Sequence, residues 1–290
     1  MRRPLVLAVY LAIAVLWGST WMVIRVGLRD LPPFLFAGVR MVLAALLLAP
    51  LALRGGGAAT LRRSWRQVVI IAVLQVALPY GLMFVAQQWV PSGLAAILFA
   101  TFPIWIALLA RLLLPGERLT ALRVASVLMG VGGVVVLEAS RFRELSASPL
   151  LGLGSAIMVV ASMVVAFANV VARRHILAIS PLALTAGQAA VGGVLLLVAS
   201  LAAEVGRPVA FTPSAAGAVL YLAVFGSGLT YLGLYWLLPR IPIAALGVIP
   251  LLDTTVAVFL GAAVLAEPVG WSMAAGGTMV LAAAALASRS

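Results

Sequence analysis

The chain has 290 residues, of which 65% are hydrophobic and only 9% are charged, whereas a soluble domain keeps about a quarter of its residues charged. Its mean hydropathy of +1.23 is too high for a protein that covers itself with a water-facing surface, so the composition excludes a soluble globular protein. The net charge of +12 comes from 19 basic residues, all of them Arg, and they lie mostly in short connectors rather than on one basic face, which excludes a nucleic-acid-binding domain.

Ten apolar runs approach the roughly 20 residues that a membrane-spanning helix needs. In chain order, the predicted spans are 5–24, 34–53, 68–88, 93–114, 121–137, 150–171, 181–203, 215–238, 243–266 and 269–287. The first run follows a basic N-terminus and continues to Ile24, which is longer than the roughly 7–15 residues of a signal-peptide apolar region. We therefore predict an all-α membrane protein whose first helix is not cleaved.

The connectors also predict how the chain lies in the membrane. With ten spans both termini fall on one side, and the connectors of that side contain 13 Arg against 5 on the other side. Because cytoplasmic loops carry the excess of positive charge, both termini are predicted to lie in the cytoplasm. The predicted location is the inner (plasma) membrane, with the lipid bilayer around the protein.

The two halves of the chain resemble each other. Residues 79–97 match residues 230–248 at an offset of 151, which pairs Tyr80 with Tyr231 and Phe84 with Tyr235. Two further matches occur in the same order, one between residues 32–49 and 180–199, which pairs Arg40 with Gln188, and one that pairs Glu117 with Glu267. Chance similarity between Ala- and Leu-rich helices is the alternative, and three matches in one order disfavour it.

Each repeated unit contains five helices, and five is an odd number. The second copy must therefore cross the membrane in the opposite direction, as the inverted repeats of many secondary transporters do. The predicted units are residues 1–140 and 148–290, separated by a polar stretch. The predicted architecture is ten transmembrane helices as two inverted five-helix repeats.

Each unit has several short motifs. The first unit has Leu16-Trp17-Gly18-Ser19, Arg40, Pro91-Ser92-Gly93-Leu94-Ala95-Ala96 with Pro103 after it, and Gly116-Glu117-Arg118; the second has Ala186-Gly187-Gln188 and Ala266-Glu267-Pro268. These motifs resemble those of EamA-type units in the drug/metabolite transporter superfamily. The resemblance implies a ten-helix transporter similar to bacterial exporters of amino acids, including aromatic ones. Such proteins commonly carry Glu-Pro midway along the ninth helix, where this chain has Leu252-Asp253, so the role of that acid is not carried over.

Asp253 is the one acidic residue, of seven in the chain, that lies near the middle of a predicted span. An ionised carboxylate at the centre of a membrane helix costs about 2.5–3.5 kcal/mol on insertion scales. Two interpretations stay open. Asp253 either faces a water-filled cavity, where it binds a substrate amine or relays a proton, or it is a structural acid that is hydrogen-bonded to Thr254, Thr255 or another helix.

Arg40 lies about seven residues into the second span. It could bind a substrate carboxylate or pair with an acid, and its long side chain could also extend to the membrane surface. Because the resembling family often has Arg here, we favour a packing or gating role over contact with the substrate.

Prolines interrupt the interiors of predicted spans, and such a proline frees the carbonyl four residues before it. Pro79, Pro103 and Pro250 free the carbonyls of Gln75, Phe99 and Leu246. Within a bilayer such carbonyls need partners, so these breaks are tolerated where they face protein or water. Hinges that open a gate and tolerated kinks are the two interpretations.

Aromatic residues deep in the spans predict a cavity for a neutral amphipathic ligand. Trp17 and Trp21 share a helix face, as do Tyr80 with Phe84 and Tyr231 with Tyr235, because each pair is four residues apart. The residues predicted to line the substrate pathway are Trp17, Ser19, Thr20, Trp21, Tyr80, Phe84, Phe99, Ser162, Asn169, Tyr231, Tyr235 and Asp253; the predicted gate or hinge residues are Arg40, Pro79, Pro103 and Pro250.

Together these features predict a secondary transporter that exports small metabolites, above all neutral or aromatic amino acids, by alternating access. With no Lys for a phosphate-binding loop, no Cys and a single His175, we expect no cofactor, no metal, no nucleic-acid partner and no enzymatic activity. Since both repeats lie in one chain, a monomer is expected to suffice. Efflux of drugs or other metabolites, a passive channel, and a membrane-embedded lipid-modifying enzyme remain alternatives.

Overall fold

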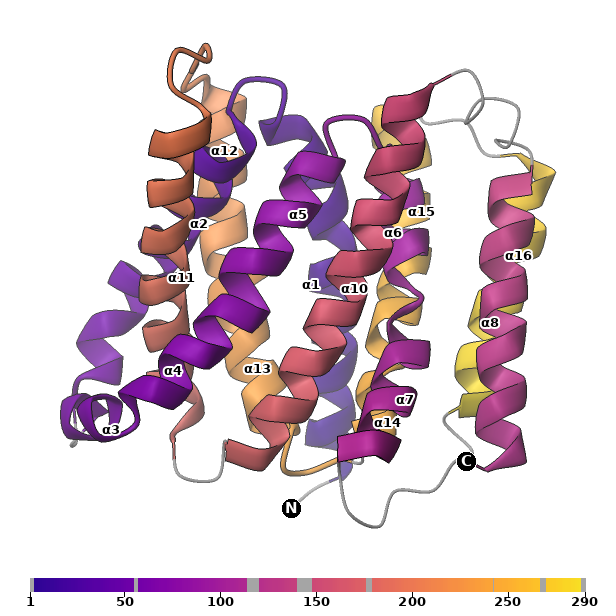
Figure 1. The fold of residues 1–290 in the computed structure, drawn as a ribbon, viewed down its shortest axis with the longest axis horizontal. Helices are drawn as coiled ribbons and strands as arrows, with labels where there is room; N and C mark the ends of the chain where they lie inside the picture. Colours follow the sequence, from indigo (N-terminus) through magenta and orange to yellow (C-terminus); the bar gives the residue numbers. More distant parts are fainter. Residues whose placement is uncertain are drawn as a thin grey trace.

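Long helices that run side by side account for most of the chain (Figure 1). The structure is a computed structural model that describes residues 3–54, 57–113, 120–139, 148–175, 179–241, 243–266 and 270–287. Within these ranges every element is helical, and seven helices are long and apolar enough to cross a membrane. The chain is therefore an all-helical, multi-pass membrane protein.

The helices follow the predicted spans closely. The elements of the first half are α1 (Arg3–Gly27), α2 (Pro33–Ala52), α3 (Gly57–Arg63), α4 (Trp65–Ala72), η1 (Val73–Ala77), α5 (Leu78–Ala86), α6 (Ser92–Phe99), α7 (Phe102–Leu113) and α8 (Ala121–Ala139). Those of the second half are α10 (Pro149–His175), α11 (Pro181–Ala203), α12 (Pro213–Tyr221), η3 (Leu222–Leu229), α13 (Thr230–Leu237), α14 (Ile243–Leu246), α15 (Ile249–Leu265) and α16 (Trp271–Ala287). The sequence did not predict the short helix α3, which lies in a connector.

Two predicted continuous spans are in fact interrupted. The span predicted at 93–114 divides into α6 and α7, and the span predicted at 243–266 divides into α14 and α15. Pro103 and Pro250 are each the second residue of the helix that follows the break. Because proline cannot donate to a carbonyl of the preceding turn, each helix restarts at its proline.

Pro79 has a different effect, because its helix stays continuous. The π-helical segment η1 precedes it, and the longer π-helical segment η3 occupies the corresponding part of the helix that contains Tyr231. Such π-helical insertions are frequent at functional sites.

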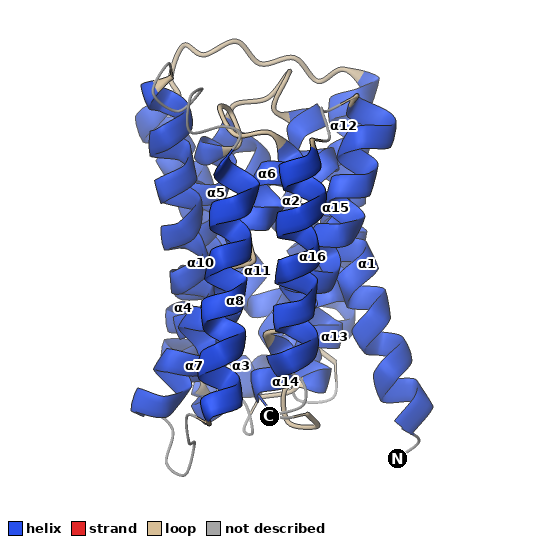
Figure 2. Cartoon of the chain, turned by 90° about the vertical axis from the view of Figure 1, so that its right-hand side faces the viewer, coloured by secondary structure: helices blue, strands red, loops and turns tan. Residues whose placement is uncertain are grey.

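Helices from the two halves pack against each other in pairs. α11 packs along α2, α16 along α8, and α15 along α6. α1 packs on α15 and α13, while α10 packs on α6, α7 and α5. Figure 1 shows α8 and α16 as a pair at one edge, and Figure 2 views the bundle from that side. Large apolar side chains such as Leu201 and Phe259 remain exposed, as a lipid-facing surface requires.

The two termini lie at one end of the helix bundle (Figure 1). α1 begins and α16 ends at the same end of the bundle, whereas α10 begins at the opposite end (Figure 1). At that opposite end, the buried carboxylate of Glu204 accepts hydrogen bonds from the backbone N–H groups of Phe34 and Leu35, at 2.8 and 2.9 Å. A negative charge at the first turn of a helix is favourable, so Glu204 ties the end of α11 to the start of α2.

Two arginines donate hydrogen bonds to backbone carbonyls at the C-terminal ends of other helices. Arg25, in the last turn of α1, donates to the carbonyls of Gln87 and Gln88 just after α5, at 2.6 and 3.1 Å. Arg173, near the end of α10, donates to the carbonyls of Leu238 and Ile241 just after α13, at 2.5 and 2.8 Å. In the sequence both residues count among the charges of the connectors. In the structure they pair carbonyls that the end of a helix leaves without a partner.

Close contact between α1 and α15 depends on Gly18. A Cβ atom on this residue would lie 2.5 Å from the Cβ of Val256 and 2.6 Å from the carbonyl oxygen of Asp253. We expect Gly18→Ala to lower the free energy of unfolding by ~1–3 kcal/mol, as overpacking typically does, in thermal denaturation of the detergent-solubilised protein.

Gly217→Ala in α12 is the matched control, since a Cβ there would meet nothing within 4 Å. It is expected to leave the melting temperature unchanged or to raise it slightly, because alanine favours a helix over glycine. Equal melting temperatures for the two variants would contradict the packing argument.

Candidate functional site

A cavity lies in the middle of the bundle and is lined by residues from both halves of the chain. Its volume is about 70 Å³, several times the ~10–15 Å³ that one water molecule needs. Its lining residues are Trp17, Thr20, Trp21, Ile24, Arg40, Gln75, Tyr80, Met83, Phe99, Phe102, Val165, Asn169, Gly226, Tyr231, Leu234, Leu246, Ile249, Pro250 and Asp253.

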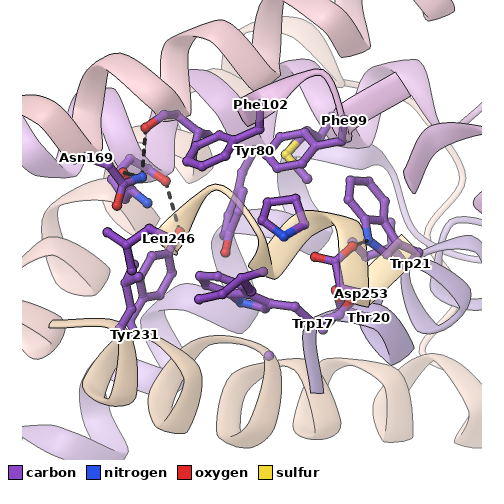
Figure 3. A pocket seen from close by; sticks show the side chains of 18 of the residues that line it. Trp17, Thr20, Trp21, Tyr80, Phe99, Phe102, Asn169, Tyr231, Leu246 and Asp253 are labelled. Carbon is purple, nitrogen blue, oxygen red and sulfur yellow. Dashed lines mark hydrogen bonds between the residues drawn. The ribbon is translucent and has the colours of Figure 1, made fainter. Parts of the chain in front are cut away.

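Six of the 19 lining residues are aromatic, and their rings form much of the wall (Figure 3). Tyr80 and Tyr231, which the sequence repeat pairs, face each other with ring centroids 6.4 Å apart. Trp17 meets Tyr231 edge-on at 6.0 Å, and Trp21 packs on Phe99 at 5.4 Å. The walls can thus hold a flat apolar group by offset and edge-to-face contacts.

Asp253 supplies a carboxylate to this wall. Its side chain is 3% exposed, and the indole N–H of Trp21 points to Oδ1 at 3.4 Å (Figure 3). Thr254 does not satisfy it, because the Thr254 hydroxyl lies 2.6 Å from the carbonyl oxygen of Pro250 and 3.1 Å from that of Ala96. Thr255 is exposed on the outside of its helix. The carboxylate is therefore held beside the cavity by one long hydrogen bond.

Amide side chains provide a second polar region. Asn169 on α10 donates to the carbonyl of Val165 at 2.8 Å and approaches Oε1 of Gln75 at 3.5 Å. Figure 3 shows Asn169 and Tyr231 on the far side of Tyr80 and Trp17 from Asp253. The cavity thus has polar groups at two ends and aromatic rings between them.

The carbonyls freed by prolines are used inside the protein. The Tyr231 hydroxyl donates to the carbonyl of Gln75 at 3.0 Å, and the Ser162 hydroxyl donates to that of Phe99 at 3.0 Å. Leu246, whose carbonyl Pro250 frees, lines the cavity. The breaks are thus located where the two halves meet.

The structure separates the predicted site residues into two groups. Trp17, Thr20, Trp21, Arg40, Tyr80, Phe99, Asn169, Tyr231, Pro250 and Asp253 line the cavity. Ser19, Phe84, Ser162, Tyr235, Pro79 and Pro103 lie outside its lining. Ser19 hydrogen-bonds the hydroxyl of Tyr221 at 2.7 Å, and Phe84 and Tyr235 are fully buried behind the wall.

Sequence reasoning missed several lining residues. These are Ile24, Met83, Phe102, Val165, Gly226, Leu234 and Ile249, together with Gln75 and Leu246, of which the sequence singled out only the carbonyls. Gln75 is a polar residue inside an apolar run, one turn before Pro79, and that position was a usable signal. The apolar residues gave none, because lipid-facing and cavity-facing positions have the same composition.

Among the residues that the structure describes, no group of three or more His, Cys, Asp or Glu side chains could hold a metal ion. Glu117, Glu144 and Glu267 lie outside the described residues, as do the side chains of Glu138 and His175.

The chain resembles known transporters over most of its length. Residues 4–138 and 152–289 match the EamA-like transporter family, so the chain belongs to this family. It is 34% identical over 256 residues to the "uncharacterized inner membrane transporter YedA" of Escherichia coli, covering 86% of this chain and 79% of that protein. It is 24% identical to the "uncharacterized transporter YoaV" of Bacillus subtilis, with 87% and 85% covered. A solved crystal structure shares the fold, with a TM-score of 0.76 and 22% identity over 99% of this chain and 98% of that one.

Loss of the Tyr231 hydroxyl tests the bond that supports η1. Tyr231→Phe removes a buried hydrogen bond to the carbonyl of Gln75, so we expect the free energy of unfolding to fall by ~1–3 kcal/mol, measured by thermal denaturation in detergent. Tyr221→Phe is the control, because its half-buried partner Ser19 keeps a bond to the carbonyl of Leu16. A loss for Tyr231→Phe no larger than that of the control would show that the buried bond contributes little.

Proposed function

We propose that this EamA-like transporter is a secondary transporter that exports neutral or aromatic amino acids across the inner membrane by alternating access. Its ten transmembrane helices form two inverted five-helix units, residues 1–140 and 148–290. The cavity between them is the substrate site, and the units rock about it to expose it to one side and then to the other.

One observation carries this proposal: residues paired by the sequence repeat meet across the cavity. Tyr80 and Tyr231 face each other at 6.4 Å. Each packs at 6.0 Å on the next aromatic residue of its own helix: Tyr80 on Phe84 with tilted rings, and Tyr231 on Tyr235 with stacked rings. A central site at the boundary between two repeats is the arrangement that alternating access needs.

The packing pattern supports the inverted repeats. If the spans are counted from one to ten, the second packs on the seventh, the fourth on the ninth and the fifth on the tenth. A two-fold rotation axis between the two units would produce this pairing of equivalent helices. α1 and α10 begin at opposite ends of the bundle (Figure 1). The fourth and ninth spans both break at a proline, and the third and eighth both contain a π-helical segment.

The chemistry of the cavity supports the substrate class. Aromatic rings line its middle, and a carboxylate and amides mark its ends (Figure 3). A ligand with an apolar group and a charged amino group fits this wall, because Asp253 can pair with the amine while the rings cover the apolar part. Drug efflux is the alternative within the same family.

The distribution of Arg residues supports the predicted orientation of the chain in the membrane. Helix α3, which contains Arg62 and Arg63, lies at the end of the bundle where α1 begins (Figure 1). Since the basic side faces the cytoplasm, the termini are on the cytoplasmic side. The relative from Escherichia coli is named as an inner membrane protein, which agrees with the same location here.

A lipid-modifying enzyme is disfavoured. Among the described residues that line the cavity, Asp253 is the one carboxylate, and no histidine accompanies it, so a paired acid and base for catalysis is missing from this wall. The named relatives are transporters.

Uptake into proteoliposomes tests the proposal. The purified chain is reconstituted and offered labelled neutral, aromatic, acidic and basic amino acids, with and without a proton gradient. We expect saturable counterflow of neutral or aromatic amino acids. Absence of counterflow for every amino acid, with transport of a known drug-efflux substrate such as ethidium, would assign the protein to drug efflux instead.

Asp253→Asn is expected to keep the fold and to weaken transport of amine-bearing substrates by about 10-fold or more, because a charge-assisted hydrogen bond is lost. The measurement is the initial rate of counterflow against substrate concentration over a range of external pH. Asp30→Asn is the control, since that carboxylate accepts from Thr212 at 2.6 Å at the end of the bundle, outside the cavity lining. Normal rates for Asp253→Asn at every pH would remove this residue from the mechanism.

A further inference from the structure

Arg40 is a buried cation on the wall of the cavity. Its side chain is 2% exposed and lies among the lining residues, so it does not extend to the membrane surface. A guanidinium cannot lose its proton in a protein, and burying such a charge is unfavourable without a partner. The question is which group neutralises it.

The neighbours of Arg40 satisfy its faces but leave donors free. The guanidinium carbon lies 4.2 Å from the ring centroid of Tyr80 and 5.1 Å from that of Phe84. Rings stack on the flat face, whereas the N–H groups point outward in the plane. Nε and Nη1 are enclosed and have no hydrogen-bond partner. In the described part of the chain no carboxylate forms an ion pair with Arg40, and the Asp253 side chain instead accepts from Trp21.

The second unit shows that packing alone does not require this charge. At the position equivalent to Arg40 it has Gln188, which accepts a hydrogen bond from Tyr235, the residue equivalent to Phe84. Gln188 is fully buried and lies outside the cavity lining. A neutral side chain thus fills this place between the same two helices in one unit, while the other unit has a cation that borders the cavity.

We propose that Arg40 is the anion subsite of the cavity and binds the carboxylate of the substrate. Arg40 and Asp253 are the two lining residues with a formal charge, and they have opposite signs. Resting on the proposed function, this assigns the amino acid's carboxylate to Arg40, with the side chain among the rings. A single guanidinium matches one negative charge, so a carboxylate fits better than a doubly charged phosphate.

Three small molecules, each with a phenyl ring but with a different polar group, test the anion subsite at Arg40. 3-Phenylpropionate, its amide and phenylethylamine are titrated into the full-length protein in detergent, and their affinities are compared by calorimetry. We expect the wild type to bind the carboxylate at least about 10-fold more tightly than the amide, as a charge-assisted bidentate bond would give.

Two variants of Arg40 test whether this residue causes the preference for the carboxylate over the amide. Arg40→Gln copies the second unit and is expected to bind acid and amide equally, with unchanged affinity for phenylethylamine, while Arg40→Lys keeps part of the preference. Their melting temperatures show whether each variant folds. If Arg40→Gln fails to fold, the wild-type comparison of acid and amide decides with Arg40→Lys.

Equal affinity of the wild type for acid and amide would overturn the assignment, as would a carboxylate preference that survives in Arg40→Gln. Displacement of 3-phenylpropionate by an equal concentration of inorganic phosphate would refute the specificity for a carboxylate. A carboxylate preference that depends on Arg40, in a protein that moves no amino acid in proteoliposomes, would refute the proposed function and leave the anion subsite standing. Amino-acid counterflow that Arg40→Gln leaves unchanged would refute the anion subsite and leave the proposed function standing.

Discussion

The need to pair every backbone polar group inside a bilayer governs this structure. A helix meets that need by itself, so the chain is built from helices, and each departure from a helix must find a partner in the protein. The departures here gather around one place. Tyr231 pairs the carbonyl of Gln75, Ser162 pairs that of Phe99, and Leu246 borders the cavity. The interior that satisfies broken helices is also the interior that can hold a ligand.

The same constraint makes buried charges informative. Glu204 is buried but accepts two backbone N–H groups at a helix start, and Arg25 and Arg173 each bind two carbonyls beyond a helix end. These charges have structural partners. Arg40 and Asp253 are also buried, and the protein satisfies them only in part. Because an unpaired polar group inside the membrane is unfavourable, these two partly satisfied charges are the ones that we propose a ligand engages.

The two halves differ in chemistry at positions that the sequence repeat pairs. Tyr80 and Tyr231 occupy matched places and meet across the cavity. At a neighbouring matched position the first half has Arg40 and the second has Gln188, so the cavity is electrostatically asymmetric. A cavity between two identical units would offer the same charge from both sides. In the proposed inverted arrangement, such a difference would let the cavity bind a molecule whose two ends differ.

The sequence by itself determined the membrane class, the helix positions to within a few residues, the family and most of the polar cavity residues. The physical reason is that apolar run length, proline and a lone acid within a span are local signals. Only the tertiary structure decided which face of each helix meets the cavity. Phe84 and Phe99 look alike in sequence, yet Phe99 lines the cavity and Phe84 is buried behind it. In lipid, side chains on the outer and inner faces are equally apolar, so periodicity cannot separate them, and the contacts between helices distant in sequence settle their orientation.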